Sequence, residues 1–196
     1  ENQISNFKND GVILIKEVFL PWIEKLKKGF QKVLDNPSPY GSENILKLSE
    51  GRFFEDYCNW ERVDEFKDFM FNSPAGEIVA QCTGSKKIQL FHEHIFLKDP
   101  GTKKETPWHQ DLPYYCVDGD DTGSFWIPLE SVSKDNSLKV FKRSHNLSKL
   151  VKPTKWSNDK SWYRFNENFM DMPNIDQNNI FNVEMSAGDA ILFNFK

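Results

Sequence analysis

The segment Trp108–Leu112 carries a histidine and an aspartate separated by one residue. Its apolar and aromatic surroundings are typical of a β-strand, in which successive side chains point to opposite faces. We therefore expect His109 and Asp111 to project together and Gln110 to face the other way. An imidazole beside a carboxylate supplies two of the three ligands of the 2-His-1-carboxylate triad, which holds non-haem Fe(II) with open positions. A hydrogen-bonded His–Asp pair without a metal is the alternative, and the motif alone does not exclude it.

The other histidines fit metal binding less well. His92 and His94 form a His-x-His pattern within a predicted strand, Ile88–Lys98. Metal sites that use this pattern need a glutamate shortly after it, and none follows within the strand, so packing in a polar core is the favoured interpretation. Alternation along the strand places His94 and Lys98 on one face. His145, in Arg-Ser-His, is interpreted as a structural hydrogen-bonding residue.

Composition limits the class of protein. The 196 residues suit one domain with a substantial core, and the net charge of −4 gives no sign of a nucleic-acid-binding surface. Three dispersed cysteines (Cys58, Cys82 and Cys116) form no C-x-x-C motif, which indicates free thiols in a reducing compartment and predicts a cytoplasmic location. No apolar run approaches the ~20 residues of a membrane span.

Helices are predicted in the first part of the chain and strands in the second. A polar stretch, Asn146–Asn179, is predicted to be an inserted loop over the sheet. This order indicates an α+β fold, with a helical scaffold over about residues 20–84 and an antiparallel jelly-roll-like β-core over about residues 86–196. The predicted helices are Pro21–Asp35, Phe54–Phe71 and a third that Ser73 caps and Gly84 ends; the predicted strands are Gly11–Phe19, Ile88–Lys98, Trp108–Tyr115, Ser124–Leu129, Leu138–Phe141 and Val183–Phe195.

Four segments resemble, in sequence and in order, the phytanoyl-CoA dioxygenase family: Pro107–Tyr115, Ser124–Leu129, Ser144-His145 and Ala187–Phe193. The resemblance covers nearly the whole chain, and the ordered set is more specific than any single motif. It implies a double-stranded β-helix (jelly-roll) domain with N-terminal flanking helices. It also implies an Fe(II)- and 2-oxoglutarate-dependent dioxygenase that hydroxylates a small organic or lipid-like substrate. Related halogenases lack the carboxylate ligand, so Asp111 favours hydroxylation.

The resemblance implies that His109 and Asp111 are iron ligands and that His94 and Trp126 line the 2-oxoglutarate pocket. Lys98, on the same strand face as His94, is a further candidate for that pocket. Tyr114 and Tyr115 follow the metal pair and are candidates for substrate contact, with core packing as the alternative for strand aromatics. From the residues alone, a solvated strand end is an equally good interpretation of Lys98, and core packing is an equally good one of Trp126.

The resemblance also implies a third iron ligand, a histidine, and an arginine for the far carboxylate of 2-oxoglutarate. Both would follow the strand that ends at Phe195, whereas no histidine occurs after His145 and the sequence ends at Lys196. We therefore expect both residues beyond Lys196, so that residues 1–196 would be a single oxygenase-like domain lacking its C-terminal strands.

Two alternatives stay open from the sequence. One is a non-catalytic jelly-roll binding domain that has lost the complete metal site. The other is a different metal chemistry in which His94 joins His109 and Asp111. The substrate and the oligomeric state are not predicted.

Overall fold

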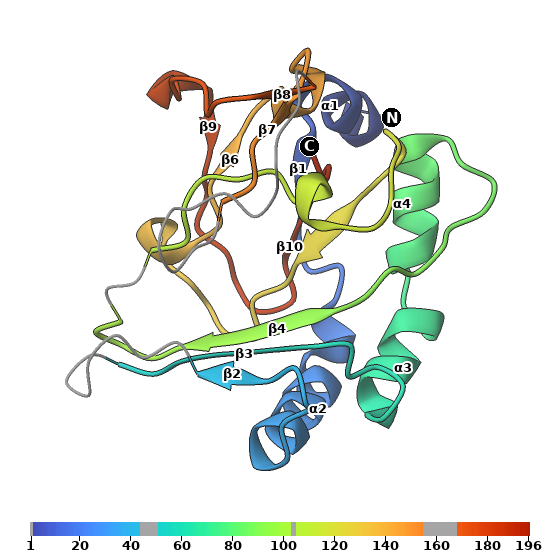
Figure 1. The fold of residues 1–196 in the computed structure, drawn as a ribbon. Helices are drawn as coiled ribbons and strands as arrows, with labels where there is room; N and C mark the ends of the chain where they lie inside the picture. The colour runs from blue at the N-terminus through green and yellow to red at the C-terminus, as the bar shows by residue number, and fades with distance from the viewer. Residues whose placement is uncertain (1, 44–50, 103–104, 155–167) are drawn as a thin grey trace.

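The computed structural model describes residues 2–43, 51–102, 105–154 and 168–196. Its longer helices lie in the N-terminal half, interspersed with strands β1 to β3, and the remaining short strands follow, so the predicted mixture of helices and sheets is confirmed (Figure 1). The helices are α1 (Asn2–Asp10), α2 (Ile23–Asp35), α3 (Asp64–Asn72) and α4 (Ala75–Thr83), and the 3-10 helices are η1 (Leu20–Trp22), η2 (Leu112–Tyr114), η3 (Lys134–Asn136), η4 (Ser144–Asn146) and η5 (Gln177–Asn179). None of the helices in these ranges is long and apolar enough to cross a membrane.

The strands in the described ranges form four small sheets. β1 (Val12–Ile15), β10 (Ala190–Phe193) and β5 (Ser124–Trp126) make one antiparallel sheet, so both ends of the sequence meet in it. A second antiparallel sheet has the order β2-β3-β4, and two strand pairs complete the set. Their members are β2 (Ser42–Glu43), β3 (Phe53–Tyr57), β4 (His94–Lys98), β6 (Val140–Phe141) with β9 (Ile180–Phe181), and β7 (Leu150–Val151) with β8 (Phe169–Met170).

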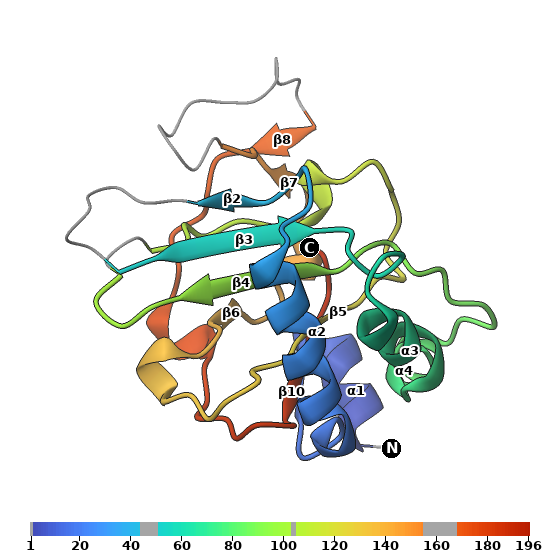
Figure 2. The ribbon, with the colours of Figure 1, turned by 90° about the horizontal axis from the view of Figure 1, so that it is seen from below.

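The β2-β3-β4 sheet has one face toward helix α2 and the other toward the remaining strands (Figures 1 and 2). Apolar residues recur every three or four positions along α2, and this stripe packs on the sheet. The shared cluster includes Leu26 and Val33 from the helix, Phe54 from β3 and Leu97 from β4. Phe54 and Leu97 point to α2, so the residues that alternate with them face the other strands.

Several predicted elements are confirmed. The helix predicted at residues 21–35 is η1 followed by α2, and the third helix is α4, one residue later than expected. It ends at Gly84, whose φ of 78° lies in the left-handed region that favours glycine. The turn predicted before the last strand also occurs, because the Asp189 carboxylate accepts hydrogen bonds from the N–H groups of Ser186 and Glu17.

Other predicted elements are wrong. The helix expected from Phe54 begins only at Asp64, because Phe53–Tyr57 pairs along its whole length with β4. The strand expected over Ile88–Lys98 pairs only from His94 onward. Helix α1 was not predicted. The expected inserted loop contains the paired strands β7 and β8, and its residues 155–167 lie outside the described part of the chain.

Candidate active site

The segment with the His-x-Asp motif is not a strand, which corrects the prediction for Trp108–Tyr115. Residues 105–110 have no ladder partner, and the chain turns at Asp111 into the 3-10 helix η2. The carbonyl of Asp111 accepts the N–H of Tyr114 at 2.9 Å, and Pro113 has no N–H to offer a neighbouring strand. The two side chains meet nonetheless, with His109 Nε2 3.2 Å from Asp111 Oδ1.

Long-range hydrogen bonds hold this segment in place. The N–H of Leu112 donates to the carbonyl of Phe195 at 2.9 Å, which ties the turn to the residues after β10. Gln110 is buried and bonds in another direction from the His–Asp pair. Its Oε1 accepts the N–H of Val151 at 2.8 Å, and its Nε2 donates to the carbonyl of Ser144 at 3.3 Å. The backbone between His109 and Asp111 is therefore fixed by residues distant in sequence.

Both ring nitrogens of His109 lie beside oxygen atoms, since Nδ1 is 2.9 Å from the carbonyl of Pro107. Burial alone would lower the pKa of His109, but the hydrogen bond and charge of Asp111 and the Pro107 carbonyl outweigh it, so the pKa is raised. Asp111 and the Pro107 carbonyl thus favour the imidazolium form more than water does around a free histidine. A metal ion bound at Nε2 would displace a proton, while the contact of Nδ1 with a carbonyl would orient the ring.

The donor pair fits a shared metal ion. Two ligand atoms about 2.1 Å from one ion, with bonds at right angles, lie about 3 Å apart. The 3.2 Å between His109 Nε2 and Asp111 Oδ1 is close to that separation. Within the described residues, no group of three or more His, Cys, Asp or Glu side chains could hold a metal ion. The alternative in which His94 joins this pair around one ion is therefore wrong for this arrangement.

An aromatic cluster lies on the other side of Asp111. Tyr115 lies near enough to Asp111 for the carboxylate to affect its pKa. The Tyr115 ring packs against Phe91, His92 and Phe195, with centroids 4.8, 5.2 and 5.2 Å away. Burial, and then the negative charge of Asp111, raise the pKa of Tyr115, so the phenol stays protonated.

His94 and Lys98 share one face of β4, as the alternation predicted. Opposite them on β3 stand Tyr57, paired with His94, and Phe53, paired with Lys98. The Tyr57 ring stacks on His94 at 4.0 Å. Lys98 Nζ lies 4.6 Å from the centre of the Phe53 ring and donates to Thr106 Oγ1 at 3.3 Å. This face is turned away from α2.

The remaining predicted site residues have well-defined packing partners. Trp126 packs against the core cluster that contains Met185 and Ile191. The Tyr114 hydroxyl bonds to the backbone of Thr154, accepting from N–H at 2.8 Å and donating to C=O at 3.0 Å. The Tyr114 ring lies edge-on to His109 at 5.8 Å. Both tyrosines thus adjoin the pair, while the cofactor role of Trp126 stays a prediction.

Two residues near the pair were not predicted to belong to the site. Tyr57 was missed because its segment was expected to be helical, and strand pairing with β4 is what brings it here. His92 was assigned to packing, yet its Nδ1 is buried without a hydrogen-bond partner among the described residues. His145, by contrast, is confirmed as a structural residue, because its Nε2 lies 3.1 Å from the carbonyl of Lys8.

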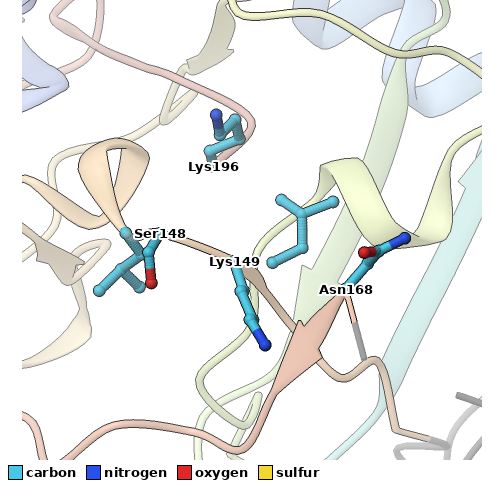
Figure 3. A pocket seen from close by; sticks show the side chains of 6 residues that line it. Ser148, Lys149, Asn168 and Lys196 are labelled. Atoms are coloured by element: carbon cyan, nitrogen blue, oxygen red, sulfur yellow. The ribbon is translucent and has the colours of Figure 1, made fainter. Parts of the chain in front are cut away.

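A pocket of about 310 Å³ lies between residues 147–150, Asn168 and Lys196 (Figure 3). Lys196 borders this pocket, and its carbonyl accepts the Ser144 hydroxyl at 2.7 Å. Lys196 Nζ pairs with Asp120 at 2.7 Å. The lining residues are Leu147, Ser148, Lys149, Leu150, Asn168 and Lys196.

Solved structures of similar fold were found at low sequence identity. The carbocyclase SnoK from nogalamycin biosynthesis, described as non-haem and α-ketoglutarate-dependent, has a TM-score of 0.74 at 14% identity, covering 99% of this chain and 74% of that one. The epimerase SnoN, in complex with Fe3+, α-ketoglutarate and nogalamycin RO, has a TM-score of 0.69 at 13% identity, covering 99% and 73%. EvdO2 from Micromonospora carbonacea var. aurantiaca, complexed with 2-oxoglutarate, has a TM-score of 0.68 at 14% identity, covering 100% and 80%.

These likenesses establish the fold alone. No curated protein matches the sequence. The family model described as phytanoyl-CoA dioxygenase (PhyH) matches residues 7–196, which include both members of the His–Asp pair and all four segments that carry the resemblance. The resemblance drawn from the sequence is thereby confirmed, and the chain belongs to the phytanoyl-CoA dioxygenase family.

Proposed function

We propose that this member of the iron- and 2-oxoglutarate-dependent oxygenases hydroxylates a small organic or lipid-like substrate. The observation that carries the proposal is the 3.2 Å contact between His109 Nε2 and Asp111 Oδ1 at the family's motif. Similarity to the SnoK and EvdO2 structures also supports a double-stranded β-helix as the common core. A carboxylate ligand at Asp111 favours hydroxylation over halogenation.

In this proposal His109 and Asp111 hold the iron, which together with 2-oxoglutarate supplies the oxidation of a C–H bond. The chain itself binds and orients the reactants and excludes water from the site. The Pro107 carbonyl orients the imidazole through Nδ1. Lys98 offers a positive charge for a carboxylate from the face of β4 that is turned away from α2. The 2-oxoglutarate pocket would be formed by His94, Lys98 and Trp126, and the substrate would lie beside Tyr114 and Tyr115.

A second candidate is an oxidative rearrangement, in which a C–H bond is broken without insertion of oxygen. The structural similarity to SnoN, an epimerase, and to SnoK, a carbocyclase, favours it. The two candidates differ in the product: a hydroxylated product gains one oxygen atom, whereas an epimer or carbocycle does not. High-resolution mass spectrometry of the product in an 18O2 atmosphere separates them.

Both candidate functions require bound iron, so iron uptake by the full-length protein tests both of them. Anaerobic titration with Fe(II) should show one site, and 2-oxoglutarate should then be converted to succinate when oxygen is admitted. His109→Ala and Asp111→Ala should abolish both. Gln81→Ala, on the exposed side of α4, should change neither. A wild-type protein that takes up no Fe(II) would refute the assignment and favour a binding domain without chemistry.

A further inference from the structure

His92 carries a buried polar atom that its packing role does not explain. The Nδ1 atom of its ring is buried and has no hydrogen-bond partner among the described residues. Shutting an imidazole nitrogen away from water without a partner is costly, so buried polar groups are normally paired with protein, water or a ligand. Packing accounts for the ring of His92 but leaves this nitrogen unexplained.

Three aromatic rings hold the His92 ring in place. Phe91 and Tyr115 stand edge-on to it, with centroids 4.7 and 5.2 Å away, and Tyr57 is stacked beside it at 6.2 Å. Tyr57 is also stacked on His94, so the two imidazoles lie on the same face of the chain. This is the face of β4 that is turned away from α2.

Glu93, the next residue, anchors the backbone beside His92. It is buried, and its carbonyl accepts the N–H of Cys58 at 3.1 Å. Its carboxylate accepts the N–H groups of Asn59 and Trp60. The backbone that carries the His92 ring is therefore tied to the residues after β3, and the direction of the ring is set before any ligand binds.

His92 lies between the His–Asp motif and the proposed 2-oxoglutarate pocket. Tyr115, whose ring packs on it, ends the turn η2 that Asp111 begins, and His94 of the proposed pocket follows two residues later. Burial, and then the charge of His94, lower the pKa of His92 against the opposite effect of Asp111. The ring is thus neutral near neutral pH, and a neutral imidazole can donate one hydrogen bond and accept another.

We propose that His92 is a 2-oxoglutarate-binding residue whose Nδ1 donates a hydrogen bond to an oxygen of the cosubstrate, an inference that rests on the proposed function. Such an oxygen would satisfy the buried nitrogen. His94 and Lys98, the other proposed members of the pocket on this strand, lie farther along the same face. This role adds a ligand contact to the packing that the sequence predicted for His92.

Two substitutions separate hydrogen bonding from packing. His92→Phe keeps an aromatic ring for the contacts with Phe91 and Tyr115 and removes both ring nitrogens. His92→Asn loses the ring and keeps a short side-chain amide that can donate from about the place of Nδ1. A hydrogen-bonding role therefore predicts that 2-oxoglutarate binding suffers more in His92→Phe, whereas a packing role predicts that it suffers more in His92→Asn.

Anaerobic calorimetric titration of 2-oxoglutarate into the full-length Fe(II)-loaded protein measures the difference. Loss of a hydrogen bond to a charged group should raise the Kd of 2-oxoglutarate by about 10- to 100-fold in His92→Phe. The Kd should rise by less than about five-fold in His92→Asn, which retains a donor. Fe(II) affinity, measured separately, should stay within about two-fold of the wild type in both variants.

An unchanged Kd in His92→Phe, or a loss in His92→Asn at least as large as in His92→Phe, would overturn the inference. A His92→Phe protein that fails to fold would overturn it too, because the ring nitrogens would then serve the fold. In these cases a wild type that binds Fe(II) and 2-oxoglutarate leaves the proposed function standing. A wild type that takes up no Fe(II) would refute the proposed function, and the inference with it.

Discussion

Replacing Gln110 tests whether the proposed iron ligands His109 and Asp111 depend on the hydrogen bonds that the Gln110 side chain makes. Gln110 lies between the two proposed ligands in sequence but is buried against another part of the chain. Its amide accepts the N–H of Val151, itself a buried residue, and donates to the carbonyl of Ser144. These are the side-chain bonds that hold the backbone between His109 and Asp111 from this side.

The cost of Gln110→Ala follows from two effects. An unsatisfied Val151 N–H costs about 1–3 kcal/mol, because it is buried and gains no water in exchange. The one lost methylene group, Cγ, costs about 0.8 kcal/mol. The free energy of unfolding should therefore fall by about 2–4 kcal/mol. Gln110→Met retains most of the volume and should lose only the hydrogen-bond part, about 1–3 kcal/mol.

Urea unfolding followed by the fluorescence of the six tryptophans measures these differences, provided that the m-values of the variants agree. Gln81→Ala removes an exposed glutamine of α4 and should change stability by less than about 0.5 kcal/mol. Fe(II) affinity should fall in Gln110→Ala because His109 and Asp111 share the loosened backbone. A loss of stability below about 1 kcal/mol, or equal losses in the alanine and methionine variants, would refute the reasoning.

Further predictions concern two other positions. Asp189→Ala should lower the free energy of unfolding by about 2–5 kcal/mol in urea titrations, since its carboxylate accepts from Lys16 Nζ and two backbone N–H groups. Burial alone would raise the pKa of Asp189, but these bonds lower it. Its stabilising contribution is therefore present above the unfolded pKa of about 3.9 and is lost as pH falls through the folded pKa, so Asp189→Ala should flatten the acid limb of a stability–pH profile. Gly11→Ala should lower the melting temperature, because φ is 73° and a Cβ would stand 2.4 Å from His145 Nδ1, whereas Gly76→Ala, with open space around it, should not.

The convergence of His109 and Asp111 could be predicted from the sequence, although the predicted backbone was wrong. Alternation along a strand and a turn at Asp111 both bring the two side chains together. Pro113 already argued against a strand at this position, because proline has no backbone N–H to donate to a neighbouring strand. The turn is held by the hydrogen bond from the Leu112 N–H to the carbonyl of Phe195. Phe195 lies far along the chain, and no local sequence pattern indicates such a partner.

The segment that begins at Phe54 also shows that local sequence patterns do not reveal a distant partner. Trp60, Phe66 and Met70 have the helical spacing that predicted a helix, and they do pack together around α3. Extending that helix back to Phe54 failed because Phe53–Tyr57 finds a strand partner in β4, roughly forty residues later. Tyr57 therefore reaches the site through tertiary pairing, and helical spacing gave no reason to place it there.

The hydrogen bond between Leu112 and Phe195 can form only late in the synthesis of the chain. A ribosome releases the chain from its N-terminus, so the histidine and aspartate of the motif emerge more than eighty residues before the carbonyl that fixes their turn. A nascent chain that has not yet exposed Phe195 lacks this brace, as well as the ring that packs on Tyr115. The turn that carries the two proposed iron ligands therefore gains this brace only after the strand of residues 190–193 has been made and can pair with β1.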